Sequence, residues 1–283
     1  MEACGQGVSI AGRIRVSGGD INDACILKLS DGHKVFLKEN TRANSGFFHA
    51  ESQGLEAIRA TRTIAVPEVL LYGTYGDRSF LIMECLEPGQ RRGSFWEDFG
   101  HSLSEMHKRE FLIDNNNCYG FMEDNYIGAG KQINTPSGSW VDFFRDMRLR
   151  PQFEWAKDKL KREDAERMDY LLAHLDRYIA EPAKPSLLHG DLWSGNFVLG
   201  PDGRAWLIDP AAYVGAAEAD IAMTELFGGF APEFYSAYRE GGLIEPEYGE
   251  RRNIYNLYHM LNHLNLFGGS YLYSVRRMLD ALF

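Results

Sequence analysis

The first part of the chain alternates short apolar runs with small polar turns. Residues 24–29 and 33–39 are two such runs, and the Asp31–Gly32 pair between them is a strong signal for a β-hairpin. From residue 47 to residue 60, apolar side chains recur at helical spacing. Two further strands are expected at 66–73 and 79–84.

Beyond Pro88 the pattern changes to longer segments with helical periodicity. Two helices are expected in the middle of this part, with breaks at Pro151 and at a charged run. The expected helices span residues 95–107, 142–155, 164–179 and 254–264. The chain is therefore predicted to have an α+β fold with two lobes. Residues 1–85 form a β-rich lobe, and residues 86–283 form a mainly helical one.

Composition narrows the class of protein. The net charge of −10 argues against nonspecific nucleic-acid binding, which requires a basic surface. No apolar run approaches the length of a membrane span, and the first residues lack the pattern of a secretory signal. The four cysteines form no C-x-x-C pair, which fits a reducing compartment. We expect a soluble cytoplasmic protein without nucleic-acid or membrane partners, and a monomer is favoured.

The most informative stretch lies between residues 187 and 210. His189, Asp191 and Asn196 reproduce the H-x-D-x-x-x-x-N spacing of kinase-type catalytic loops. Asp209 follows at the end of a short apolar run. Phosphoryl transfer from ATP requires a carboxylate near the acceptor hydroxyl, together with an Asn and an Asp that hold Mg²⁺ on the phosphates. The sequence therefore predicts a kinase, and the two lobes fit the bilobal protein-kinase-like fold.

Each residue of this stretch has a predicted role and an alternative. Asp191 would position the acceptor hydroxyl and take its proton, although an Asp in a turn is often only a loop cap. Asn196 and Asp209 would supply the hard oxygen ligands that Mg²⁺ prefers. His189 is expected to organise the loop rather than to transfer protons. Asp220 is expected to brace the catalytic loop through backbone hydrogen bonds.

The N-terminal lobe offers a candidate nucleotide site. Lys38 follows a turn containing Gly18 and Gly19, and Glu51 near the start of the next helix is its expected ion-pair partner. Alone, the pair would suit a solvated Lys and an ordinary first-turn Glu, and the turn does not spell G-x-G-x-x-G. Backbone groups between the lobes can read the edge of adenine. This connecting segment comprises Glu84, Cys85 and Leu86.

With these residues in hand, the chain resembles the fructosamine kinase family (ketosamine 3-kinases), a branch of the aminoglycoside and choline kinase-like fold. The resemblance spans nearly the whole chain, and Trp193 in the catalytic loop separates this family from choline kinases and most aminoglycoside kinases. The segments that carry the resemblance are 48–51, 125–128, 132–134, 144–149, 189–196, 209–211, 213–215, 218–220 and 261–265.

The resemblance implies ATP-dependent phosphorylation of the C3 hydroxyl of ketosamines, which are fructosamines or ribulosamines on free amines or glycated lysines. The 3-phosphate is unstable and releases the amine, so the family acts in deglycation. Trp193, His263 and Asn265 would lie in the substrate pocket. Two other hypotheses stay open, namely a kinase for an aminoglycoside or another small hydroxyl substrate, and a nucleotide-binding pseudokinase scaffold.

One departure from the resembled family concerns redox chemistry. Many members carry a Cys in the glycine-rich loop that can form a disulfide between subunits, whereas this chain has Asp20 there. Cys25 lies further along, in a predicted strand, and a buried strand Cys is usually inert. We therefore expect no oxidation-linked dimer through this loop.

Overall fold

The computed structural model describes residues 7–16 and 22–283. Gly18 and Gly19 of the candidate nucleotide site and Asp20, which stands in place of the loop Cys of the resembled family, lie outside the described residues, so the predictions made for them stay predictions. Across the part of the chain that is described, no helix has the length and apolar character needed to cross a lipid bilayer.

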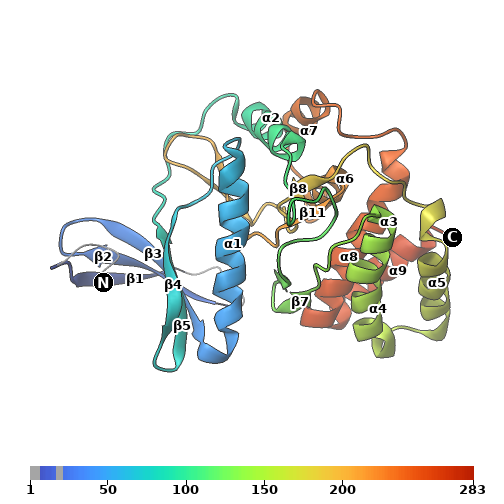
Figure 1. Cartoon of the computed structure of the whole chain (residues 1–283), viewed down its shortest axis with the longest axis horizontal. Coiled ribbons are helices and arrows are strands. Elements are labelled where there is room, and N and C mark those ends of the chain that lie inside the picture. Colours follow the sequence, from blue (N-terminus) through green and yellow to red (C-terminus); the bar gives the residue numbers. More distant parts are fainter. Residues whose placement is uncertain (1–6, 17–21) are drawn as a thin grey trace.

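A five-stranded antiparallel sheet and one helix form the N-terminal lobe (Figure 1). The strand order is β1-β2-β3-β5-β4, and helix α1 packs against β4 and β5. At the turn between β2 and β3, Gly32 has a φ of +89°, which a glycine adopts without strain. The elements are β1 (Ile10–Val16), β2 (Asp23–Leu29), β3 (Lys34–Thr41), α1 (Ser45–Thr61), β4 (Val69–Tyr75) and β5 (Arg78–Glu84).

Helices dominate the C-terminal lobe, and its described residues also form three two-stranded antiparallel pairs, β6–β7, β8–β11 and β9–β10. Its first half contains α2 (Phe95–Lys108), β6 (Asn125–Ile127), β7 (Gly130–Gln132), α3 (Trp140–Phe143), α4 (Arg150–Ala156) and α5 (Arg162–Ala173). Its second half contains β8 (Ser186–Leu188), β9 (Phe197–Leu199), β10 (Ala205–Leu207), β11 (Tyr213–Gly215), α6 (Ala217–Thr224), α7 (Pro232–Arg239), α8 (Tyr248–Phe267) and α9 (Leu272–Asp280).

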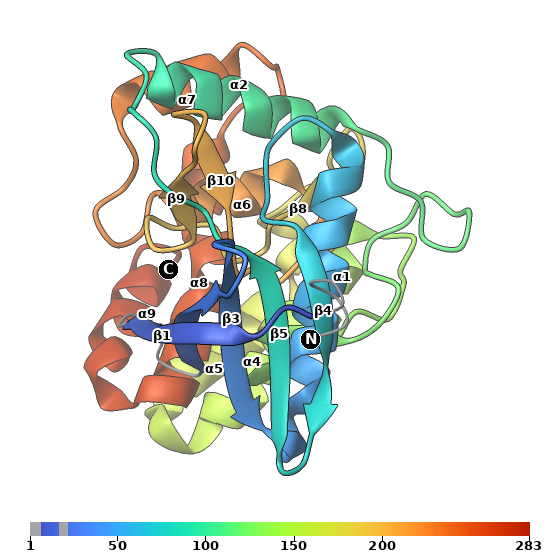
Figure 2. The same ribbon diagram turned by 90° about the vertical axis from the view of Figure 1, so that its left-hand side faces the viewer.

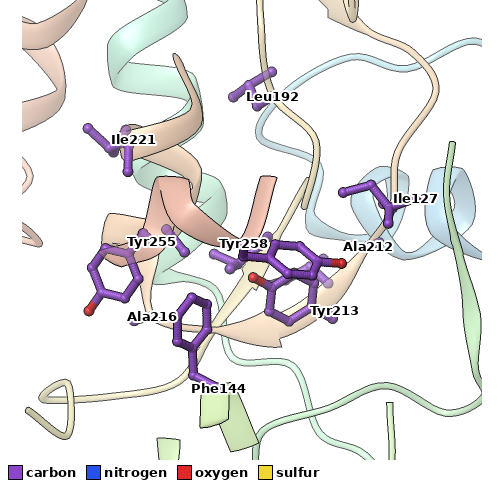
Figure 3. Packing of buried hydrophobic residues seen from close by; sticks show 14 of the residues in the cluster. Ile127, Phe144, Leu192, Ala212, Tyr213, Ala216, Ile221, Tyr255 and Tyr258 are labelled. Atoms are coloured by element: carbon purple, nitrogen blue, oxygen red, sulfur yellow. The ribbon is translucent and has the colours of Figure 1, made fainter. Parts of the chain in front are cut away.

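A large hydrophobic core fills the C-terminal lobe. Helix α8 packs against α4, α6 and α9, and α2 packs against α7 (Figures 1 and 2). Figure 3 shows the aromatic part of this core, in which Phe144, Tyr255 and Tyr258 gather around Tyr213, the first residue of the strand that follows Ala212. Leu192 of the predicted catalytic loop is buried in the same core, so the loop is anchored by an apolar side chain.

The prediction that Pro151 breaks a helix is wrong. A π-helical turn over Phe144–Leu149 joins α3 to α4, and Pro151 lies in the first turn of α4. Proline is tolerated in a first turn because the N–H groups there have no intrahelical acceptor. The helical run therefore continues through the proline to residue 159.

The two lobes touch through the segment that connects them. The Gly89 N–H donates to the carbonyl oxygen of Gly200 over 3.0 Å, so the connector lies against the β9–β10 turn. A second contact joins the Leu207 N–H to the carbonyl oxygen of Ala65, at 2.9 Å. These backbone bonds fix the strand pair that precedes Asp209 against the N-terminal lobe.

Candidate active site

The predicted catalytic loop begins directly after β8 and is held by a buried carboxylate. Asp220 accepts hydrogen bonds from the backbone N–H groups of His189 and Gly190, at 2.7 and 2.8 Å. Gly190 has a φ of +82°, and a Cβ there would lie 2.0 Å from the carbonyl oxygen of Ala211. Only glycine fits this position, and Asp220 braces the loop as predicted.

His189 links the loop to the strand pair that leads to Asp209. Its Nε2 lies 2.9 Å from the carbonyl oxygen of Ile208, and its Nδ1 lies 3.3 Å from the backbone N–H of Asp191. This pattern assigns the proton to Nε2 and leaves Nδ1 as the acceptor. Burial lowers the pKa of His189, so the ring is neutral near pH 7. The arrangement suits a loop organiser.

The carboxyl group of Asp191 lies half-buried beside Asn196. The Asn196 Nδ2 donates to the Asp191 carbonyl oxygen at 2.8 Å and to its Oδ2 at 3.0 Å. Burial raises the pKa of Asp191 to about 7, and the nearby charges of Asp209 and Asp220 act in the same direction against the Asn196 hydrogen bond. A carboxylate with this pKa can take a proton near neutral pH.

Lys38 of β3 lies between two carboxylates from different elements. Its Nζ is 2.6 Å from Glu51 Oε1 on α1, and it also contacts Asp209 Oδ1. Burial opposes the charge of Lys38, but Asp209 and Glu51 outweigh this effect and raise its pKa. Burial raises the pKa of Glu51 to about 7, although Lys38 opposes the rise. The predicted Lys38–Glu51 pair therefore forms in the structure.

Asp209 and Asn196 are brought together by the β9–β10 pair. Asn196 precedes β9, Asp209 follows β10, and the Ile208 N–H donates to the Asn196 carbonyl oxygen at 3.0 Å. Asp209 has a φ of +56°, a strained conformation of the kind that clusters at functional sites. Burial opposes its ionisation, but Lys38 outweighs this effect and lowers the pKa of Asp209. This carboxylate is therefore ionised.

The donor set at this place fits a magnesium ion. The Nδ2 of Asn196 is committed to Asp191, which leaves its Oδ1 as a neutral oxygen ligand. The Asp209 side chain is 44% exposed, so an ion can reach its carboxylate. Among the described residues, no three His, Cys, Asp or Glu side chains cluster as a metal-binding group. Asn196 and Asp209 would supply two oxygen ligands, and Mg²⁺ in proteins commonly takes its remaining ligands from phosphates and water.

A buried polar chain behind Asp209 was missed by the sequence analysis. Asn125 Nδ2 donates to the carbonyl oxygen of Ala212 at 2.7 Å, and Gln132 Nε2 donates to that of Ala211 at 3.0 Å. Gln132 also donates to Asn125 Oδ1 at 2.7 Å and accepts from the Tyr258 hydroxyl at 2.6 Å. These bonds connect α8 and the β6–β7 hairpin to the backbone just after Asp209.

His107 was also missed, and it completes the bracing of the loop. Its Nε2 lies 3.2 Å from Asp220 Oδ2, and its Nδ1 lies 2.6 Å from the Tyr238 hydroxyl. Burial would raise the pKa of Asp220, but the hydrogen bond from His107 outweighs it and holds the pKa below its ordinary value. The sequence contains no functional signal for His107 beyond its position at the end of the amphipathic helix predicted at residues 95–107.

The connecting segment starts where β5 ends. The Glu84 N–H donates to the Glu68 carbonyl oxygen at 2.8 Å, and Cys85 and Leu86 continue from there as half-buried residues outside regular secondary structure. Burial raises the pKa of the Cys85 thiol. The predicted adenine contacts of these residues stay predictions.

The three predicted substrate residues do not lie together. Trp193 and His263 are linked through Phe227, with ring centroids 5.7 and 5.2 Å from it. Asn265 instead faces α4, where its Nδ2 donates to the backbone and side-chain oxygens of Gln152, both at 2.9 Å. Its amide holds two helices together, and this geometry lends no support to a substrate contact.

The architecture and the residues at the lobe junction define the class of protein. The chain has the bilobal α+β fold of protein-kinase-like phosphotransferases. An aminoglycoside phosphotransferase solved with ADP and hygromycin B shares this fold, with a TM-score of 0.65 at 15% identity over 97% of this chain and 94% of that one. A Haemophilus somnus 129PT protein, provisionally assigned as a fructosamine-3-kinase, superposes with a TM-score of 0.89 at 28% identity over 100% of this chain and 94% of that one.

Sequence comparison gives the family. The family model for fructosamine kinase matches residues 1–283. A Synechocystis sp. protein named "probable ketoamine kinase" is 39% identical over 98% of this chain and 92% of its own length. The chloroplastic protein-ribulosamine 3-kinase of Oryza sativa subsp. indica is 38% identical over 98% of this chain and 80% of its own length. The chain belongs to the fructosamine kinase family, as its residues led us to expect.

Proposed function

We propose that this protein transfers the γ-phosphoryl group of ATP to the C3 hydroxyl of ketosamines. The observation that carries the proposal is the convergence of Lys38, Asp191, Asn196 and Asp209 at the junction of the two lobes. They come from β3 and from the segments around β9 and β10, and only the folded chain brings them together. A pseudokinase scaffold would have no need of the complete set.

Each residue has a chemical task in this proposal. Asp191 accepts the proton of the acceptor hydroxyl as the bond between that oxygen and the γ-phosphorus forms and the bond to the β-phosphate oxygen breaks. Lys38, oriented by Glu51, contacts the ATP phosphates, and Glu84, Cys85 and Leu86 border the adenine. Asn196 and Asp209 hold Mg²⁺, which when bound screens the charge of the phosphates.

Two observations favour ketosamines as the acceptors in this proposal. Trp193 in the catalytic loop is the residue that marks the family, and the relatives named above are ketoamine and protein-ribulosamine kinases. In this proposal the acceptor is a fructosamine or ribulosamine, free or on a glycated lysine. The unstable 3-phosphate then releases the amine in a cytoplasmic deglycation reaction.

A substrate panel tests the proposal directly. ATP consumption would be measured with ribulosyl-lysine, fructosyl-lysine and kanamycin in parallel, and ³¹P NMR would locate the new phosphate ester. We expect turnover of a ketosamine, phosphate on C3, and release of free lysine. A clear preference for kanamycin would instead identify an aminoglycoside kinase, and ATP binding without turnover of any acceptor would point to a scaffold.

A further inference from the structure

Five aromatic rings form a continuous row that begins at the catalytic loop. Phe227 lies 5.7 Å from Trp193 and 5.2 Å from His263, measured between ring centroids. His263 in turn lies 5.6 Å from Phe267 and 5.0 Å from Tyr271. The rings come from four separate segments, namely the catalytic loop, the loop after α6, the end of α8 and the turn before α9. Tertiary structure, not local sequence, assembles this row.

Two rings of the row are open to solvent. Phe227 is 43% exposed and Phe267 is 49% exposed. Trp193 stands two positions after Asp191, and its ring covers Gly195, because a Cβ added there would lie 2.4 Å from the indole. Large apolar side chains that stay exposed in a row beginning at the catalytic loop are suited to holding part of a ligand.

The loop that presents Phe227 is strained and pinned. Phe227 has a φ of +54°, an outlier for a bulky residue, and Gly228 and Gly229 follow with φ values of +105° and +75°. The Tyr235 hydroxyl accepts from the Phe230 N–H at 3.0 Å and donates to the Thr224 carbonyl oxygen at 3.1 Å, which fixes both ends of the loop. Such strain persists where the surroundings enforce it, typically at ligand sites.

The chemistry of the row suits an alkylammonium chain. Aromatic faces bind methylene groups and attract cations. His263 donates from Nδ1 to the His259 carbonyl oxygen at 2.8 Å, which leaves Nε2 as an acceptor in the neutral ring. A lysine side chain extends about 6 Å from Nζ to Cα. One or two ring-to-ring steps of the row cover that length.

We propose that Trp193, Phe227, His263, Phe267 and Tyr271 form the subsite for the amine-borne part of the ketosamine, a lysyl chain with its adjoining peptide. The inference rests on the proposed function, since the amine is attached at C1, two carbons from the phosphorylated C3. A sugar whose C3 hydroxyl meets Asp191 therefore carries its amine only a few bonds from that hydroxyl, and Trp193 follows Asp191 by two positions. The row selects substrates by carrier, favouring long alkyl carriers over small amines.

Two substitutions on separate elements test the subsite. Phe227→Asn removes the ring and keeps a residue type that tolerates positive φ, while Phe267→Ala removes the exposed ring at the end of α8. Tyr273→Ala is the matched control, because Tyr273 is 70% exposed and lies beyond the row. For each protein, kcat/KM would be measured for the ribulosamine of hippuryl-lysine and for that of methylamine.

The readout is the ratio of the two kcat/KM values, which is independent of the folded fraction because both substrates meet the same preparation. We expect Phe227→Asn and Phe267→Ala each to lower the ratio about 10-fold, mainly through KM for the long carrier, with no change for Tyr273→Ala. An unchanged ratio in both variants of an active enzyme overturns the subsite alone. So does a shift from oligomer to monomer with an unchanged ratio, because a second copy would then cover the row. A wild-type chain inert toward both ketosamines overturns the proposed function as well.

Discussion

Asp191 and Asp209 are identical side chains whose surroundings give them different charge behaviour. Burial raises the pKa of Asp191 to about 7. At Asp209 the contact with Lys38 outweighs burial and lowers the pKa. A carboxyl group that titrates near neutral pH can exchange a proton, and one that stays ionised can hold a cation. The environment therefore separates the roles that spacing in the sequence could only suggest.

Removing the charge of Asp191 should separate chemistry from binding. We expect Asp191→Asn to lower kcat by roughly 10²- to 10⁴-fold, because the amide cannot accept the hydroxyl proton. Nucleotide affinity, followed by fluorescence titration or calorimetry, should stay close to that of the wild type. Asp169→Asn, at an exposed position on α5, controls for the loss of one negative charge. Turnover close to the wild-type rate in Asp191→Asn would exclude Asp191 from the reaction.

His259 should make the fold sensitive to mild acid. Burial lowers the pKa of this residue to about 3, with His263 and Arg148 acting in the same direction and Asp220 opposing them. Its Nδ1 is buried without a hydrogen-bond partner among the described residues. Below about pH 6.5 the unfolded chain therefore binds more protons than the folded one, so the free energy of unfolding decreases as the pH is lowered. This histidine should cost about 2 kcal/mol between pH 7.5 and pH 5.

Urea unfolding at several pH values measures this cost. In His259→Gln the free energy of unfolding should decrease less on acidification than in the wild type, because the glutamine does not titrate. His33→Gln, at an exposed histidine, should keep the wild-type slope. Equal slopes for the wild type and His259→Gln would show that the His259 ring is already protonated in the fold or accessible to water.

At the scale of elements, local signals were sufficient for some parts of the fold and insufficient for others. The β2–β3 hairpin follows from its Asp31–Gly32 turn, and α1, α2 and α8 follow from helical periodicity. Strand β1 was not predicted, because it is an exposed edge strand whose register depends on pairing with β2. Strands β8 to β11 are three residues long, too short to show a period.

The same limit explains the residues that the sequence analysis missed. The motif spacing identified Asp191, Asn196 and Asp209 because one short segment contains them. Asn125 and Gln132 lie about 80 residues before the backbone groups that they bind, with separations of 87 and 79 positions. A polar residue in a loop pattern gives no hint of its partner, so this support of the site is visible only in the fold.

Breaking the chain of hydrogen bonds at Gln132 should weaken the metal site. Gln132→Met removes the donor to Ala211 and the link to Tyr258, so the segment after Asp209 loses its fixed position. We expect the half-saturating Mg²⁺ concentration to rise by about 10- to 100-fold, the usual effect of losing support behind a ligand. The measurement is turnover against free Mg²⁺ at saturating ATP.

Gln152→Met is the matched control for that experiment. Gln152 is an equally buried glutamine, but its hydrogen bonds go to Asn262 and Asn265 on α8. It should lose stability without a change in Mg²⁺ dependence. If both variants shift the Mg²⁺ requirement to the same extent, general destabilisation and not the position of Asp209 is responsible.

At the scale of the whole molecule, the site exists only where the two lobes meet. Lys38 and Glu51 come from the N-terminal lobe, while Asp191, Asn196 and Asp209 come from the C-terminal lobe. The relative position of the lobes therefore sets the distance between the phosphate contact and the acceptor side. The hydrogen bond from Leu207 to Ala65 crosses between the lobes, and the connector around Gly89 lies against the β9–β10 turn that leads to Leu207, so together these contacts fix this position.

Gly89→Ala should disturb this contact with a single methyl group. A Cβ at Gly89 would lie 2.3 Å from the carbonyl oxygen of Pro201, and this backbone atom can move only with the β9–β10 turn. Because that turn leads to Asp209, we expect a stability loss of about 1–3 kcal/mol together with a lower kcat and a higher KM for ATP. Gly93→Ala, in the same connector but with no atom within 4 Å of its Cβ, should behave like the wild type. Thermal unfolding and steady-state kinetics of the two variants separate the outcomes: a kinetically silent Gly89→Ala would mean that the connector yields without moving the lobes.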